Sequence, residues 1–230
     1  MKIKFIASSK QHFESFDPPV PTQKILPKWY KNQGKYINGK FKIADNGNPS
    51  HTIKGCMPVF DMLSAGYTVT MPADAYFTLK EDGSYSIQWS VDTVKLIEHH
   101  EIVQYDKITI PEGFNPIALK FVQPWIIKTP PGYSCLFIHP TYNFDLPFYV
   151  LPAIVDTDKH PIPINFPFFL KDGFEGMIEM GTPIMQIIPF KRDDWKSEIS
   201  YSKDGISFEG AKRKIINRYK TFFRTIKRWD

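Results

Sequence analysis

The chain has 230 residues, a net charge of +5 and 42% apolar residues. That composition excludes an intrinsically disordered chain, and the length allows one domain with a substantial core. No apolar run approaches the roughly 18 residues that a membrane span needs, and the apolar stretch after Met1 is too short for a signal peptide. We therefore expect a soluble intracellular protein that no signal peptide directs to secretion.

Residues 1–50 are rich in proline and aromatic residues. Residues 2–7 predict a first strand, and the stretch FDPPVPTQKILPKWYKN predicts an extended arm anchored by Trp29 and Tyr30. The pairs Asn38-Gly39 and Asn46-Gly47 are typical of turns, so a hairpin or loop region should follow the arm. An arm of this kind wraps its own domain or packs across a neighbouring subunit.

Residues 51–206 have the pattern of a β-rich core domain. The segment PVFDMLSAGY predicts a short helix near residue 58, with Pro58 in its first turn and Gly66 closing it. Beyond it, short runs of alternating apolar and polar residues are separated by turns, from YTVTMPADAYFTLK to PIMQIIPFK. The pattern predicts a mainly β fold, a single β-clip or jelly-roll-like domain.

Residues 207–230 carry the basic character of the chain, because the net charge from Phe208 to Asp230 is +6. Apolar residues at helical spacing predict a C-terminal amphipathic helix. One interpretation docks this helix by its apolar stripe and leaves the basic face in solvent. A second places nucleic acid or another polyanion on the basic face, and a third lays the helix on a membrane surface. The residues that would contact a polyanion are Lys212, Arg213, Arg218, Lys220, Arg224 and Arg228.

Two aspartates, Asp156 and Asp158, stand one residue apart at the end of the apolar run LPAIVDTD. Residues i and i+2 of a strand share one face, so the two carboxylates can hold one Mg²⁺ or orient a water molecule. Aspartates at strand ends also accept hydrogen bonds from backbone N–H groups in turns, and spacing alone favours this structural role. Both interpretations stay open at the level of the sequence.

The histidines and cysteines lack the spacings that are typical of metal sites. A scattered site made by His139, His160 and a carboxylate is the one metal centre that the sequence leaves open, and we expect no metal otherwise. Cys56 and Cys135 lie in the apolar contexts KGCMPVF and GYSCLFIHP, which predict two buried, reduced thiols.

Four segments from residue 126 onward resemble the core of the dUTPase and dCTP deaminase family: IIKTPPGYSCLFIHP, VLPAIVDTD, INFPFFL and GTPIMQIIPF. The resemblance covers residues 126–190 and implies a β-clip fold, which is often trimeric in that family. It also implies that Asp156 aligns the attacking water. Asp158 and Gln186 would be the supporting catalytic residues, with Mg²⁺ as cofactor.

The sequence departs from that family where the phosphates would bind. The Arg-Ser-Ser motif is replaced by IHPTYN (138–143), and the Tyr-Arg-Gly-Glu after the motif Asp is replaced by KHPI (159–162). Thr68 stands where the first motif has its metal-side Asp, and the Gly-rich C-terminal arm is missing. Without an Arg or backbone cradle, three phosphates and Mg²⁺ have little to bind, so the resemblance favours the fold over the chemistry.

A second resemblance spans nearly the whole chain. The blocks PPVPTQKILPKWYKN, HTIKGCMPVFDMLSAGY, PWIIKTPPGYS, VDTDKHPIPINFPF and GTPIMQIIPFKRDDWK resemble a family of proteins of similar length encoded by tailed bacteriophages and some bacteria. This resemblance implies a phage-infected bacterial cell, so the location would be the host cytoplasm or the virion. It implies no activity.

Three functional hypotheses follow. The first is a bacteriophage-encoded, non-enzymatic β-protein that acts in assembly or interaction, as a virion accessory or host-interaction protein. The proline-rich arm, the basic tail and the missing catalytic motifs favour it. The second is a dUTPase-like nucleotide-binding or nucleotide-hydrolysing protein that uses Mg²⁺, and the third is a metal-dependent jelly-roll enzyme. Under the first we expect no cofactor, a homo-oligomer that would be a trimer if it follows the β-clip family, and a phage or host protein as partner.

Overall fold

The computed structural model describes residues 1–43, 50–91, 95–201 and 219–230. Its internal contacts divide the chain into two compact units, which we describe separately. The first unit comprises Met1–Ile25 and Gly66–Arg192, and the second comprises Leu26–Ala65 and Asp193–Asp230. Each unit is therefore assembled from two segments that are far apart in the sequence.

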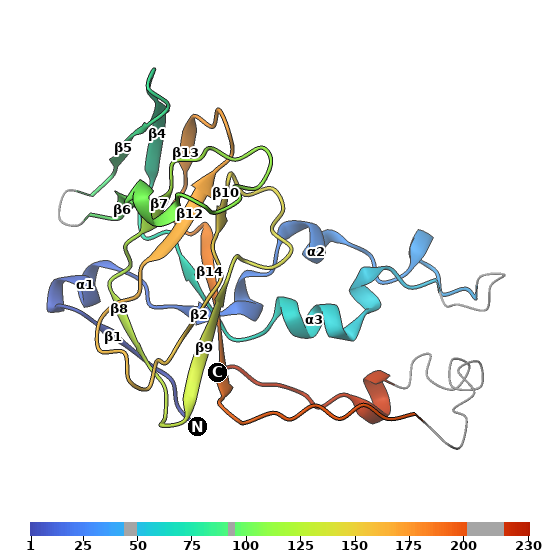
Figure 1. The fold of residues 1–230 in the computed structure, drawn as a ribbon. Helices are drawn as coiled ribbons and strands as arrows, with labels where there is room; N and C mark the ends of the chain where they lie inside the picture. Colours follow the sequence, from blue (N-terminus) through green and yellow to red (C-terminus); the bar gives the residue numbers. More distant parts are fainter. Residues whose placement is uncertain (44–49, 92–94, 202–218) are drawn as a thin grey trace. The chain divides into compact units, whose positions relative to one another are not determined.

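The first unit is built mainly of short strands (Figure 1). Alternating residues produce them, as in β4, where Ala75 and Phe77 are buried and Tyr76 is half exposed. The strands are β1 (Lys4–Ala7), β2 (Val20–Pro21), β3 (Tyr67–Thr70), β4 (Ala75–Leu79), β5 (Tyr85–Trp89), β6 (Ile97–His99), β7 (Leu119–Phe121), β8 (Trp125–Lys128), β9 (Tyr133–Ile138), β10 (Phe148–Val150), β11 (Ala153–Val155), β12 (Phe166–Leu170), β13 (Gly176–Ile178) and β14 (Pro183–Lys191). Its helical segments are α1 (Lys10–Ser15), η1 (Thr22–Ile25) and η4 (Ile102–Tyr105).

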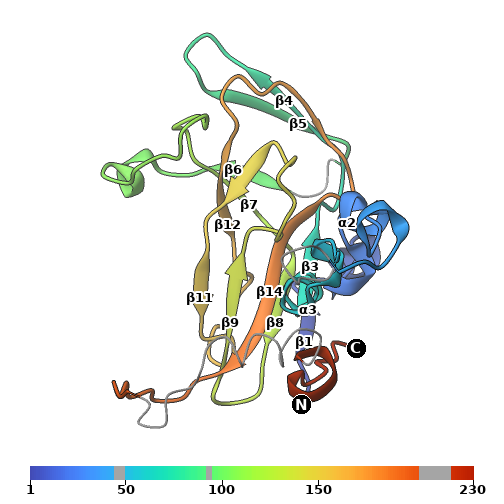
Figure 2. The same cartoon turned by 90° about the vertical axis from the view of Figure 1, so that its right-hand side faces the viewer.

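These strands form antiparallel sheets. The largest has the order β11-β9-β14-β3-β2, and a four-stranded sheet has the order β10-β12-β7-β6. The smaller sheets are β13-β4-β5 and β1-β8. Figure 2 shows the long strand β14 beside β9, and their register pairs Gln186 with Ile138 and Lys191 with Tyr133. The predicted mainly β class is confirmed, while the β-clip or jelly-roll arrangement stays a prediction.

Aromatic side chains fill the core of the first unit. Phe121 on β7 and Phe168 on β12 stack with 3.9 Å between ring centroids, and both are almost completely buried. Phe148 on the neighbouring strand β10 meets both rings edge-on. Burying a side chain of this size stabilises a fold by about 1.5–3 kcal/mol. Packing between sheet neighbours thus supplies much of the stability of this unit.

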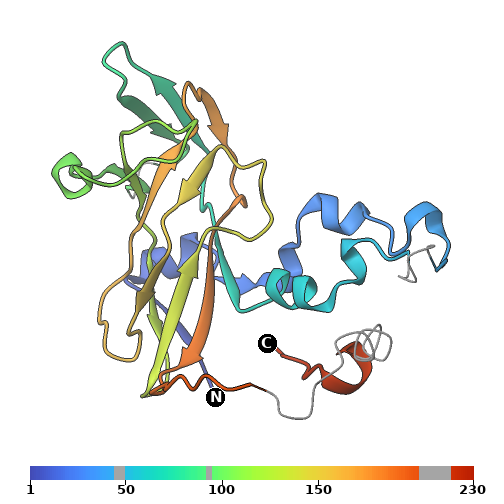
Figure 3. The same cartoon turned by 45° about the vertical axis from the view of Figure 1, so that its right-hand side comes forward.

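Short helical segments and the C-terminal residues make up the second unit. The predicted helix near residue 58 is present as α3 (Met57–Leu63), with Pro58 in its first turn. The other segments are α2 (Lys28–Asn32), η2 (Ile37–Gly39), η3 (Ile53–Gly55) and the π-helical turn η5 (Tyr219–Phe223). Figure 3 shows α2, η2, η3 and α3 in blue to cyan and η5 in red. None of the helices in the described residues is long and apolar enough to cross a membrane.

The described part of the C-terminal tail differs from the predicted amphipathic helix. Residues 207–218 of that prediction lie outside the described part, and the chain after Phe223 is not helical. Phe223 and Ile226, which the docked-stripe interpretation would bury, are 64% and 67% exposed. A basic residue docks instead, because Arg224 binds the carboxylate of Asp61 on α3. The ion pair between Arg224 and Asp61 thus makes the contact that the prediction assigned to an apolar stripe.

The two cysteines lie in different environments. Cys135 on β9 is fully buried as predicted, and burial raises the pKa of its thiol to about 11. The prediction for Cys56 is wrong, because this residue is exposed just before α3. Its apolar neighbours in the sequence, from Met57 to Phe60, are themselves only partly buried or exposed, so they form no core that covers the thiol.

Candidate functional site

Asp156 and Asp158 lie in a tight turn that follows β11. The backbone N–H of His160 donates to the carbonyl oxygen of Asp156 at 2.9 Å and closes the turn. Thr157 is fully buried between the two aspartates, with its hydroxyl 2.8 Å from that of Thr129. The turn therefore presents the two carboxylates on the same side, away from the buried threonine.

The guanidinium of Arg192 contacts both carboxylates. It donates to both oxygens of Asp158 and forms an ion pair with Oδ1 of Asp156 at 3.2 Å. It also donates to the carbonyl oxygen of Tyr133 at 3.0 Å and to Oγ of Ser134 at 2.9 Å. A two-oxygen contact between Arg and a carboxylate is strong and directional. A cation therefore bridges the two aspartates, and this cation is the side chain of Arg192.

Further hydrogen bonds tie this turn to the Pro-Pro-Gly turn before β9. The N–H of Gly132 donates to Oδ2 of Asp158 at 2.9 Å, and the hydroxyl of Ser134 donates to Oδ1 of Asp156 at 2.7 Å. Gly132 has a φ of +82°, a conformation that glycine adopts without strain. The aspartates, Arg192 and these groups together form what we call the aspartate lock, which joins the two turns to the end of β14.

The aspartate lock lowers the pKa of both carboxyl groups. Hydrogen bonds from Arg192, and secondly from the N–H of Gly132, hold the pKa of Asp158 far below its usual range. The hydrogen bond from Ser134 and then the charge of Arg192 lower the pKa of Asp156. A general base works best with a pKa near the operating pH, so these carboxylates are poor proton acceptors at neutral pH.

Gln186 lies apart from the aspartate lock. It is almost completely buried on β14, and its Oε1 accepts hydrogen bonds from the N–H and the hydroxyl of Thr141 at 3.3 and 2.9 Å. It pairs with Ile138, whereas Asp156 contacts Ser134, four residues earlier on β9. Four residues of strand span about 13 Å. Of the three predicted catalytic residues, the structure brings only the two aspartates together.

The histidines of the metal hypothesis have other surroundings. The ring of His139 lies 5.9 Å from that of Phe148 and 5.2 Å from that of Tyr149, between centroids, and burial lowers the pKa of its imidazole. His160 ends the aspartate turn. In the part of the chain that the structure describes, no three His, Cys, Asp or Glu side chains gather to hold a metal ion.

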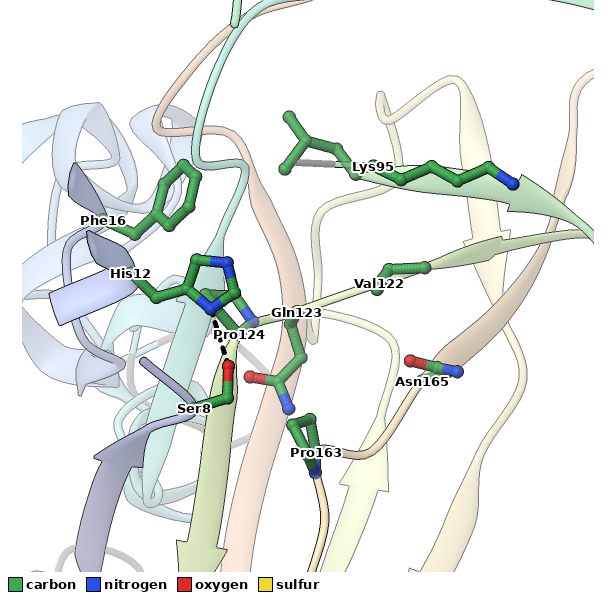
Figure 4. Close-up of a pocket in the computed structure, with 10 residues that line it drawn as sticks. Ser8, His12, Phe16, Lys95, Val122, Gln123, Pro124, Pro163 and Asn165 are labelled. Carbon is green, nitrogen blue, oxygen red and sulfur yellow. Dashed lines mark hydrogen bonds between the residues drawn. The ribbon is translucent and has the colours of Figure 1, made fainter. Parts of the chain in front are cut away.

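A cavity of about 420 Å³ in the first unit lies between α1 and the loop that joins β7 to β8 (Figure 4). Ser8 and His12 line it, with Oγ and Nδ1 2.6 Å apart, while the amide of Gln123 is engaged by the backbone of Trp125. A hydroxyl–imidazole pair is part of many nucleophilic sites. The residues that line this cavity include no carboxylate to orient the imidazole, so the pair can bind a polar ligand but lacks the third group of a triad.

A second hollow, of about 600 Å³, lies within the second unit. Leu26, Tyr30, Met57 and Phe60 form its apolar wall. Its cations come from three separate stretches of the sequence, and they are Lys31, Lys35, Lys54, Lys220 and Arg224. We call this hollow the cationic groove.

Aromatic rings position two of these cations. Tyr30 and Phe60 stack with 6.3 Å between ring centroids. The Nζ of Lys54 lies 5.6 Å from the centroid of Tyr30, and the guanidinium of Arg224 lies 5.6 Å from that of Phe60. Cation–π contacts of this kind hold a cation in place without neutralising its charge.

Asp61 compensates charge on one side of the cationic groove. It accepts hydrogen bonds from Arg224 at 2.6 Å and from Lys227 at 2.9 Å, and the bond from Arg224 is the main reason that the pKa of Asp61 is lowered. Among the described residues, no ion pair joins the four lysines of the groove to a carboxylate. The groove therefore presents positive charge that no described carboxylate compensates, beside an apolar wall.

The groove includes some of the residues that the sequence marked for polyanion contact. Lys220 and Arg224 line it, and Arg228 is exposed elsewhere on the tail. Lys212, Arg213 and Arg218 lie outside the described residues.

Sequence reasoning missed the contributions of Lys31, Lys35 and Lys54. The stretch KWYKNQGKY, which interleaves lysines with aromatic residues, was the available signal for the first two. Ser8 and His12 were missed as well, although their four-residue spacing places them together at the start of a short helix.

Comparisons with known proteins add no family to these observations. No protein-family model matches the chain, and a search of curated proteins finds no match either. The cationic groove and the aspartate lock are therefore the features from which we infer a function.

Proposed function

We propose that the chain is a bacteriophage-encoded, non-enzymatic β-protein that acts in assembly or interaction by binding an acidic partner in the cationic groove. One observation carries the proposal: four lysines without carboxylate partners among the described residues surround an apolar wall. A binding surface of this kind complements a chain that carries both carboxylates and apolar side chains. Charge complementarity then selects the partner, and buried apolar anchors supply affinity.

The aspartate lock supports a non-enzymatic role. A Mg²⁺ ion at Asp156 and Asp158 would have to displace the guanidinium of Arg192, which makes four hydrogen bonds, two to the carboxylate of Asp158 and two to groups of β9. Gln186 is engaged by Thr141 and lies elsewhere on the sheet. The dUTPase-like alternative therefore lacks free carboxylates for the metal at this turn.

Nucleic acid is the second candidate partner. Lys220 and Arg224, both predicted to contact a polyanion, line the groove, and phosphates pair readily with lysine side chains. The apolar wall favours an acidic protein segment, because phosphate groups gain nothing from contact with Leu26 or Met57.

Binding of defined polyanions tests the proposed function. Fluorescently labelled poly-glutamate and oligo-dT would be titrated with the full chain while salt rises from about 50 to about 200 mM, and we expect groove-dependent binding that weakens as salt screens the charges. Lys31→Glu/Lys35→Glu should weaken binding at least tenfold. The control Lys2→Glu/Lys107→Glu makes the same charge change on exposed residues of the first unit and should have little effect. Equal losses in both variants, or no binding at all, would contradict the proposal.

The nucleotide alternative has a separate test. Thermal unfolding would be measured with deoxynucleotides, with and without Mg²⁺, for the native chain and for Asp156→Ala. We expect no nucleotide-dependent rise in the unfolding temperature. A rise of several degrees that Asp156→Ala abolishes would establish a nucleotide site and remove the non-enzymatic proposal.

The two roles within the proposal differ in location. A virion accessory protein would be detected by mass spectrometry in purified phage particles, whereas a host-interaction protein would be found only in the cytoplasm of infected cells. Absence from particles removes the virion role.

A further inference from the structure

The segment of residues 193–201 directly follows the aspartate lock and has the composition of an acidic ligand. Its apolar side chains stand in solvent: Trp195 is 90% exposed, Ile199 is 98% exposed and Tyr201 is 81% exposed. Asp194 and Glu198 are exposed among them. The segment forms neither helix nor strand, so no regular element of its own chain holds its backbone.

The segment and the cationic groove complement each other in charge and in polarity. The segment carries three acidic residues and one lysine, whereas the four lysines around the groove form no ion pair with a described carboxylate. Trp195 is suited to the apolar wall that Leu26, Met57 and Phe60 provide, because a tryptophan in an apolar pocket is a frequent energetic anchor of interfaces. The lysines of the groove would also stabilise the indole face through cation–π contacts.

We infer that the cationic groove of one copy of the chain receives residues 193–201 of a second copy. The inference rests on the proposed function, since it names the acidic partner of the groove. In the same chain the two do not meet, because the residues that line the groove include none from 193–201 and the indole of Trp195 is almost fully exposed.

Each copy carries one groove and one segment, so two copies bind each other twice. Such an exchange gives a closed, two-fold symmetric dimer in which both contacts are the same. It also covers apolar side chains that a single copy leaves exposed, which is the situation that marks an interaction surface.

Sedimentation velocity over a range of concentrations tests the inference on the full chain. We expect the mass of a dimer, and Trp195→Ala should raise the dissociation constant at least tenfold because it removes the apolar anchor. Phe144→Ala serves as the matched control, since Phe144 is an 80% exposed aromatic side chain of the first unit. The dissociation constant of the Phe144→Ala dimer should equal that of the native dimer.

A charge-reversal pair separates this contact from general loss of folding. Lys31→Glu/Lys35→Glu/Lys220→Glu reverses the charge of the groove, because one lysine then remains beside three carboxylates, and Asp194→Lys/Glu198→Lys reverses the charge of the segment. Each variant alone should be monomeric, because like charges would meet in both contacts. An equimolar mixture should form heterodimers, because each groove then meets a segment of opposite charge. Rescue by mixing cannot arise if the segment binds only its own chain or if either variant is unfolded.

The outcomes distinguish the inference from the proposed function. A native chain that stays monomeric at all concentrations, yet binds poly-glutamate or oligo-dT through the groove, overturns the inference and leaves the proposed function standing. A dimer that survives both charge reversals also overturns it. If the native chain neither dimerises nor binds either probe, the inference and the proposed function fail together.

Discussion

The first unit buries many large apolar side chains, whereas most of those described in the second are only partly buried or exposed. Phe121, Phe148 and Phe168 pack against one another in the first unit and are at most 1% exposed. Among the described residues of the second unit, only Tyr30 and Leu63 belong to the apolar core, while Trp195 and several others are exposed. Ion pairs and cation–π contacts around Asp61 and Phe60 hold that unit together. This difference is what we expect if a partner covers the second unit, as proposed above.

The largest effect should come from the core of the first unit. Phe168→Ala removes a fully buried ring that stacks on Phe121, and we expect it to lower the free energy of unfolding by about 3–5 kcal/mol. Phe223→Ala in the second unit removes a 64% exposed ring and should change it by about 0.5 kcal/mol or less. Urea denaturation followed by circular dichroism measures both. Similar losses for the two variants would remove the contrast between the units.

A smaller effect should come from the ion pairs of the second unit. Asp61→Asn leaves Arg224 and Lys227 without their carboxylate and should weaken docking of the tail by about 1.5 kcal/mol. Hydrogen exchange of residues 219–230 measures the docking, and Asp145→Asn, a change at an exposed aspartate of the first unit, is the control. Unchanged exchange of the tail in Asp61→Asn would show that the ion pair does not hold it.

The aspartate lock should make the stability of the first unit depend on acid. The pKa of Asp158 is lower in the folded chain than the value of about 3.9 in an unfolded chain, so its stabilisation is complete above that value. It is lost as the pH falls toward the folded pKa, because protonation breaks the contact with Arg192. The thermal midpoint between about pH 5 and pH 2 should therefore fall more steeply for the native chain than for Asp158→Asn. Parallel curves would mean that the ion pair contributes nothing to stability.

The reactivity of the two cysteine thiols tests the contrast between the two units without any substitution. In the folded chain, Cys56 should react with a thiol reagent near neutral pH, whereas Cys135 should not react until the chain unfolds. The reason is that Cys135 is inaccessible and that its pKa, raised to about 11 by burial, leaves very little thiolate. Mass spectrometry after labelling counts the modified thiols. Rapid labelling of both in the folded chain would contradict the buried position of β9.

The sequence predicted those features that depend on local pattern. Alternation of apolar and polar residues identified the β class, and Pro58 marked the start of α3. The spacing of Asp156 and Asp158 suggested that both carboxylates lie on one side, and both do contact Arg192, while the Mg²⁺ site stays a prediction. That cation, Arg192, could not be predicted, because it reaches the aspartates only through the register of β14 against β9.

The cationic groove was predictable only in part, for the same reason. The charge of the tail marked Lys220 and Arg224, but Lys31 and Lys54 join them through the packing of segments that are distant in sequence. The helical spacing of the tail suggested an apolar stripe that would dock. The carboxylate of Asp61 binds Arg224 instead, and local periodicity contains no information about such a partner.

The central claim is that a second copy of the chain covers the second unit and leaves the first unit unchanged. Hydrogen exchange measured at increasing protein concentration tests this claim most directly. We expect amides in residues 26–43, 50–65 and 193–201 to become better protected from exchange as the concentration rises, while β9, β12 and β14 keep the same protection throughout. Protection that is equal in both units and independent of concentration would contradict it.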